Sequence, residues 1–94
     1  PKGTKALIDL LKNHDAAIQA ASAEALANYA DSEVKVRKEA FKALLDTIMP
    51  VKNTVDTSPT DQEARQRYDT ISTPILGSMR RLTGHEETDF QAWQ

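Results

Sequence analysis

The chain is 94 residues long, and its composition is that of an ordinary folded domain. Apolar residues make up 39% of the chain and charged residues 28%, a profile too apolar for intrinsic disorder. A formal net charge of −2 argues against a general nucleic-acid binder, which normally carries a basic excess. The lack of cysteine excludes disulfides, thiolate metal sites and cysteine nucleophiles.

No apolar run approaches the roughly 18 residues that a transmembrane helix needs, and no segment has the form of a secretory signal peptide. We therefore expect a soluble protein, whose compartment the composition does not indicate. The chain begins at Pro1 without an initiator methionine, so we expect a processed form or a domain of a larger protein.

Hydrophobic periodicity predicts three helices in the first half of the chain. The first covers about residues 4–13, with Thr4 as its N-cap. Asp15 is the predicted cap of the second helix, which runs over residues 16–30 and is rich in alanine. The apolar stripe of this second helix is predicted on Ile18, Ala21, Ala25 and Tyr29.

The third helix is predicted to start at Asp31-Ser32 and to run to about residue 49. Pro50 lacks an amide proton and clashes with the preceding turn, so we expect the helix to end or bend there. Residues 51–60 lose the helical pattern and are predicted to form a loop. That loop would be longer than the usual connection of about 2–8 residues between packed helices.

The remaining segment, 61–94, is predicted to be a long helix followed by a C-terminal cap. Thr60-x-x-Glu63 has the form of a capping box, and Gly84 suits the left-handed position that ends a helix. The apolar stripe continues through Pro74, which favours one kinked helix over two abutting helices. A final short turn carries Phe90 and Trp93.

No segment shows the sustained alternation of a β-strand, so we predict a single all-α domain over residues 1–94 with four or five helices. Two of its segments, 18–26 and 36–44, share one plan and lie 18 residues apart. A repeated helix of this kind cannot bury its apolar stripe alone and must stack on a neighbour. The repeat therefore predicts a short α-α superhelix.

The run ALIDLLKNHDAAIQAASAEAL, residues 6–26, resembles a HEAT-type repeat: a leucine-rich helix, a turn with Asn or Asp, and a second helix reading Val-Arg-x-x-Ala-x-x-Ala-Leu. Ile18 takes the Val position, while Gln19 replaces Arg and Ser22 replaces Ala. VRKEAFKAL, residues 36–44, matches the second-helix pattern more closely, including Arg37. The resemblance covers about half of the chain, and armadillo-type arrays stay open.

The spacing of 18 residues leaves no room for a first-type helix between the two segments. Either segment 36–44 takes the opposite role in the next helix pair, or the array is irregular. The tail MRRLTGHEETDFQAWQ, residues 79–94, is similar to segments that close many bacterial HEAT-type proteins. This resemblance implies a terminal segment with a capping role, and a scaffold for protein binding as the most common use of such a fold.

We predict that the chain is not an enzyme and has no catalytic, cofactor-binding or metal site. A metal site could be formed by His85, Glu87, Asp89 and the distant His14, but the spacing of these residues does not require one. The interpretation we favour for residues 85–89 is a solvated turn. The carboxylates that would have to pair for acid–base hydrolysis fall mostly on polar helix faces: Asp9, Glu24, Glu33, Glu39, Asp46, Glu63 and Asp69.

The predicted function is a helical-repeat module for protein–protein interaction or scaffolding, with a protein partner or a neighbouring domain of the same parent chain. The candidate partner-binding residues are Lys35, Lys38, Lys42 and Trp93. Trp93 either packs on the fourth helix or anchors a partner. The alternative is a nucleic-acid-binding domain, in which the lysines would share a face with Arg65, Arg67, Arg80 and Arg81. Interspersed acidic residues disfavour that alternative.

Overall fold

A computed structural model describes residues 2–84 of the chain. It contains four α-helices, and α2 is extended by a short 3-10 turn, η1, at Ala27–Tyr29. The helices are α1 (Lys2–Leu10), α2 (Ala16–Leu26), α3 (Val34–Thr57) and α4 (Gln62–Thr83). Residues 2–84 contain no strand, so the predicted all-α class is confirmed for them. The predicted C-terminal cap and Trp93 lie outside this range.

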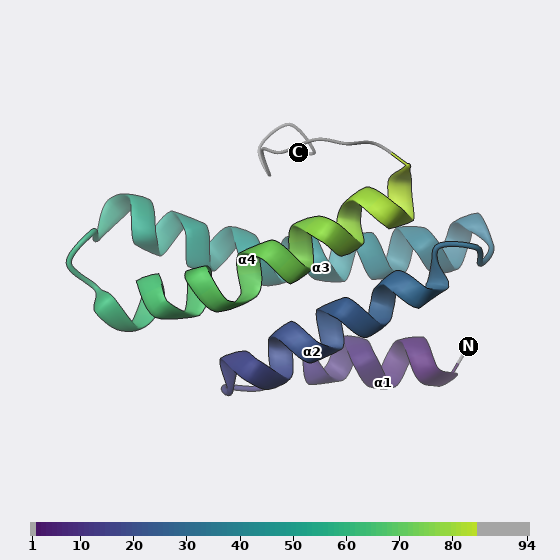
Figure 1. Ribbon diagram of the computed structural model, residues 1–94, viewed down its shortest axis with the longest axis horizontal. Helices are drawn as coiled ribbons and strands as arrows, with labels where there is room; N and C mark the ends of the chain where they lie inside the picture. The colour runs from purple at the N-terminus through teal and green to yellow at the C-terminus, as the bar shows by residue number, and fades with distance from the viewer. Residues whose placement is uncertain (1, 85–94) are drawn as a thin grey trace.

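The four helices form two hairpins, α1–α2 and α3–α4, that stack on each other (Figure 1). α4 packs against both α3 and α2, and α1 packs against α2 and α3. The α3–α4 hairpin is the longer one, and its turn projects beyond the first hairpin (Figure 1).

The core lies where the two hairpins meet and draws its buried side chains from α2, α3 and α4 and from Leu11, which directly follows α1. Its residues recur at spacings of three and four along each long helix, as a 3.6-residue period requires. The buried hydrophobic cluster consists of Leu11, Ala23, Leu26, Ala40, Leu44, Ile48, Ile71, Ile75, Met79 and Leu82. The α4 members of this cluster lie on both sides of Pro74, as the predicted continuation of the apolar stripe requires.

The apolar stripe predicted for residues 16–30 is wrong at Ile18 and Ala21, while Tyr29 packs against the core as expected. Ile18 and Ala21 are exposed, whereas Gln19 and Ser22 face the interior. Hydrophobic periodicity cannot orient this helix because almost every position in it is apolar or small. Hydrogen bonds set the rotation of α2 instead. The Gln19 side chain donates to the Leu11 carbonyl, and the hydroxyl of Ser78 in α4 donates to the Ala23 carbonyl.

α1 also differs from the prediction. The helix begins at Lys2, so Thr4 is not its N-cap, and Leu10 is exposed although its neighbour Leu11 is buried. Gly3 explains the close approach at the start of α1. A Cβ atom there would lie 2.3 Å from the Tyr29 hydroxyl oxygen, so any larger residue would displace that side chain.

Of the helix ends predicted at Asp15, Gly84 and Thr60, the first two are confirmed and the third is wrong. Asp15 caps α2, accepting the Ala17 amide at 2.8 Å. Gly84 ends α4 in the left-handed conformation, with φ of 75°. The capping box at Thr60 does not form. Asp61 is the N-cap instead, and its carboxylate accepts the Ala64 amide at 3.0 Å.

α3 does not end at Pro50, and the predicted loop over 51–60 is wrong for residues 51–57, which continue the helix. Local interactions compensate for the backbone hydrogen bond that Pro50 cannot donate. The Thr54 hydroxyl donates to the Pro50 carbonyl at 3.0 Å, and Lys52 pairs with Asp56 at 2.8 Å. Val51 also packs against the core. The loop is therefore only residues 58–61.

Pro74 is likewise inside α4, which is a single helix from residue 62 to residue 83. The choice of one helix over two abutting helices is confirmed. Ile71 and Ile75 on either side of the proline are both fully buried. Packing of this stripe on α2 and α3 compensates for the hydrogen bond that the proline removes.

Replacing Pro50 with alanine should stabilise the protein. Because α3 is helical on both sides of Pro50, we expect Pro50→Ala to raise the free energy of unfolding by about 1–3 kcal/mol, part of the roughly 3 kcal/mol that proline costs in a helix interior. Urea unfolding followed by circular dichroism measures the change.

Pro59→Ala is the matched control. Pro59 follows Ser58 in the loop, where the Asp61 amide donates to the Ser58 carbonyl at 2.9 Å, so it occupies the turn position that proline favours. Its removal should destabilise slightly, by about 0.4–1 kcal/mol. Equal effects of the two substitutions would mean that α3 does not continue through Pro50.

Candidate functional site

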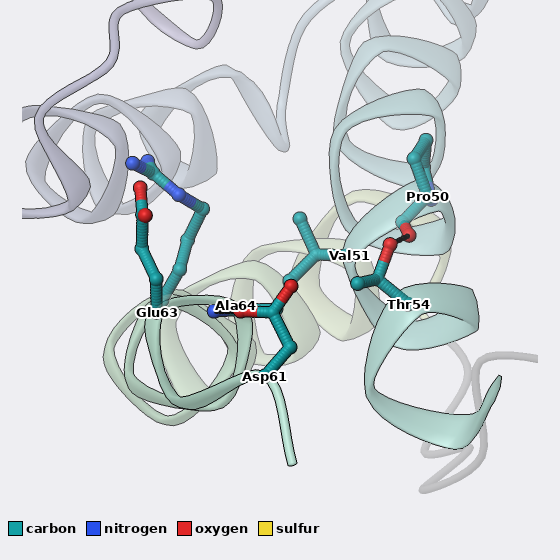
Figure 2. Close-up of a pocket in the computed structure, with 7 residues that line it drawn as sticks. Pro50, Val51, Thr54, Asp61, Glu63 and Ala64 are labelled. Carbon is teal, nitrogen blue, oxygen red and sulfur yellow. Dashed lines mark hydrogen bonds between the residues drawn. The ribbon is translucent and has the colours of Figure 1, made fainter. Parts of the chain in front are cut away.

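One hollow lies between the end of α3 and the start of α4 (Figure 2). Its volume is about 340 Å³. Val51 projects from α3 toward α4 in Figure 2, while Glu63 lies on the α4 side. The lining residues are Pro50, Val51, Thr54, Asp61, Glu63, Ala64 and Arg67.

Most of the polar groups around this hollow already have structural partners. The Thr54 hydroxyl donates to the Pro50 carbonyl, as the dashed line in Figure 2 shows, and Asp61 caps α4. Glu63 adds an exposed carboxylate in the first turn of α4, where acidic side chains favour the helix dipole. The hollow therefore offers no opposed pair of free carboxylates for acid–base chemistry.

Arg67 connects this region to the first hairpin. Its Nη1 donates to Oε1 of Gln19 at 2.6 Å, and its Nη2 donates to the carbonyl of His14. Gln19 is only 7% exposed, and its Nε2 donates to the Leu11 carbonyl at 2.6 Å. These bonds satisfy carbonyls in the α1–α2 turn that the helices leave unpaired. The Arg67 side chain therefore connects the α3–α4 hairpin to the α1–α2 hairpin.

Arg37 makes a second connection of the same kind. Its Nε donates to the Ser32 carbonyl at 3.1 Å, and its Nη1 donates to the Leu82 carbonyl at 3.4 Å. An arginine is favourable beside the C-terminal carbonyls of a helix, here those of α4. Arg37 therefore joins the start of α3 to the end of α4.

The three lysines of the predicted partner-binding set are exposed on α3. Lys42 forms a salt bridge with Asp46 at 3.0 Å, and both side chains are largely solvated. Lys38 lines a hollow at the start of α3, whereas Lys42 lines a different one that faces α1. Trp93, the fourth residue of the set, lies outside the described residues.

The arginines of the nucleic-acid alternative lie in separate places. Arg67 is turned toward the α1–α2 hairpin, and Arg65 lines a hollow near the loop over 58–61. Arg81 lines another hollow together with Glu24 of α2. None of these hollows contains a lysine from α3, so the structure gives no single basic groove among the residues it describes.

Residues 2–84 hold no group of three or more histidine, cysteine or carboxylate side chains arranged to bind a metal ion. His14 is exposed in the α1–α2 turn, and only its backbone carbonyl has a bonding role. His85, Glu87 and Asp89 lie outside the described range. Within the same range, no helix is both long and apolar enough to cross a membrane.

A largely apolar surface lies on the exposed side of α2, and the sequence reasoning did not identify the residues that form it. Ile18 is 38% exposed and Leu10 is 42% exposed. Ala17 and Ala21 are also exposed, and their spacing places them on one face of α2 with Ile18. We call Ala17, Ile18 and Ala21 the outer face of α2, and the exposed Glu24, three positions after Ala21, adds a carboxylate on the same side. The signal that could have revealed it is the absence of any continuous polar face in α2.

Comparison of the chain with protein-family models, with curated proteins and with solved structures finds no match. The resemblance of residues 6–26 and 36–44 to HEAT-type repeats therefore stays a prediction.

Arg67→Ala should destabilise the fold by about 1–3 kcal/mol, because the substitution leaves the buried Oε1 of Gln19 without its donor. Chemical denaturation measures the loss. Arg65→Ala is the control, since it removes the same charge from the same helix at an exposed position and should stay within about 0.5 kcal/mol. Similar losses in both variants would show that net charge matters rather than the hydrogen bonds.

Proposed function

We propose that this chain is a non-enzymatic helical-repeat module that binds protein through the outer face of α2. The observation that carries this proposal is the exposure of Ile18 on a helix that has no continuous polar face. A helix that is hydrophobic all round is normally covered on every side. Here α1 and α4 cover part of α2 and leave its outer face to solvent.

The stacking of the hairpins supports an array of HEAT type. The first helices, α1 and α3, pack on each other, and so do the second helices, α2 and α4. Adding hairpins by the same rule would continue both layers, as repeat proteins do. Segment 36–44 lies in α3, so it has the first-helix role, which is the opposite of the role of segment 18–26 in α2.

In such an array the next hairpin would pack against the side of α1–α2 that is away from α4. That side contains the outer face of α2, whose small alanines allow a neighbouring backbone to approach closely. The occupant that suits this surface is another amphipathic helix. It belongs either to a partner protein or to a neighbouring domain of the same parent chain.

Energetics favour a tethered occupant over a free one. Full burial of an isoleucine stabilises by about 1.5–3 kcal/mol, and Ile18 is already more than half buried. Free association costs on the order of 4–15 kcal/mol in lost motion, so Ile18 alone cannot sustain it. A linked domain avoids much of that cost because its effective concentration is high.

Photo-crosslinking tests the proposal. A photoreactive amino acid at position 18 should crosslink to a protein partner or linked domain in cells, and Ala21→Glu in the same chain should abolish the product. The control is the same photoreactive residue at position 66, an exposed site on α4. Equal crosslinking from positions 18 and 66, or insensitivity to Ala21→Glu, would contradict the assignment.

The nucleic-acid alternative is tested separately by fluorescence anisotropy with labelled DNA and RNA oligonucleotides. We expect no binding tighter than the nonspecific range of about 10⁻⁴–10⁻⁶ M at physiological salt. Tight binding that falls steeply with salt and is lost in the double variant Lys35→Glu/Lys38→Glu would favour nucleic acid over protein as the partner.

A further inference from the structure

A hollow of about 410 Å³ lies between α2 and α4, on the face that the two second helices share. Glu24 lines it from α2, and Thr73, Gly77 and Arg81 line it from α4. Ser78 belongs to its floor, is only 2% exposed and donates its hydroxyl to a carbonyl of α2. The two helices are therefore in contact below the hollow, which opens toward solvent.

Opposite charges lie on the two walls of this hollow. Glu24 and Arg81 are both exposed, one on each helix. Among residues 2–84, neither side chain has an ion pair or a hydrogen bond, although both border the same hollow. An acidic wall opposite a basic wall is complementary to itself after a rotation by half a turn. A second copy, related by a two-fold axis through the hollow, would bring Glu24 of each copy to Arg81 of the other.

Gly77 leaves room for such a copy. It lies half-buried in the interior of α4, where glycine is the least favourable residue after proline. A Cβ atom at this position would have no atom from the rest of the described chain within 4 Å, so the fold itself does not require glycine there. Thr73 and Arg81 lie four residues before and after it on the same helix face. A glycine at the centre of this face allows the backbone of a neighbouring helix to approach closely.

We propose that a second copy of this chain binds the α2–α4 face, so that the protein forms a two-fold symmetric dimer. Symmetry doubles each contact: two Glu24–Arg81 pairs form, and the partner approaches each copy at Gly77. Exposed ion pairs contribute little to stability, so the dimer is weak and depends on protein concentration. It leaves Ile18 exposed, and binding of another protein to the outer face of α2 does not depend on it.

Charge reversal tests the dimer by sedimentation velocity over about 1 μM to 1 mM protein. Glu24→Arg and Arg81→Glu should each weaken dimerisation roughly tenfold or more, since each change brings like charges together at both pairs. An equimolar mixture of the two variants should dimerise again. Position 24 of one protomer and position 81 of its partner then carry opposite charges in both pairs. A contact within a single chain cannot be restored by mixing.

Gly77→Leu separates association from folding. The new side chain has open space within one chain, so circular dichroism should show native helix content and undiminished stability. The affinity of the dimer should nevertheless fall roughly tenfold or more, because the side chain occupies the place of the partner's backbone.

Two variants outside the hollow serve as controls. Arg65→Glu makes the same charge reversal at another exposed position of α4, and Ile18→Glu places a charge on the outer face of α2. Both should leave the dimer unchanged. A chain that stays monomeric throughout the concentration range would overturn the proposal and leave the hollow to a different protein. So would a dimer that withstands Glu24→Arg, variants that mixing does not rescue, or loss of the dimer in Ile18→Glu.

Discussion

The arrangement of the two hairpins depends on a buried amide, Gln19, that is bonded on both sides. It donates to the Leu11 carbonyl at the end of α1 and accepts from Arg67 of α4. A buried polar group without partners would be costly, so both bonds must be present whenever Gln19 is inside. This requirement fixes the rotation of α2, joins the α1–α2 turn to α4, and thereby sets how the first hairpin lies on the second.

The same constraint explains why Ile18 of α2 is exposed. Once Gln19 faces the interior, Ile18, one position earlier and about 100° away around the helix, is turned toward solvent and is 38% exposed. A core isoleucine with a surface glutamine would be the conventional choice for an isolated hairpin. The reversed placement suits a helix that has neighbours on both sides, as our proposed function requires.

Much of the fold could be predicted from the sequence, because α4 and most of α3 have one clear apolar stripe each. Ile71, Ile75 and Met79 follow the helical period and are all buried. α2 could not be oriented in this way, since alanine fits either face. The helix end predicted at Pro50 was also wrong, because the helix continues there through the hydrogen bond of Thr54 and the tertiary packing of Val51. The candidate site was predicted least well: the α3 lysines are exposed as expected, but the exposure of Ile18 and Ala21 on α2 was not foreseen.

The projecting turn of the α3–α4 hairpin has a consequence for dynamics. Its last helical residues are held by bonds within one turn, such as Thr57 to Asn53 and Lys52 to Asp56, and residues 56–63 are all exposed. Segments with local bonds and few buried contacts open at a lower free energy than the core. Amide exchange in this end of the molecule should therefore proceed by local fraying, while the half beside α2 exchanges only when the hairpins separate.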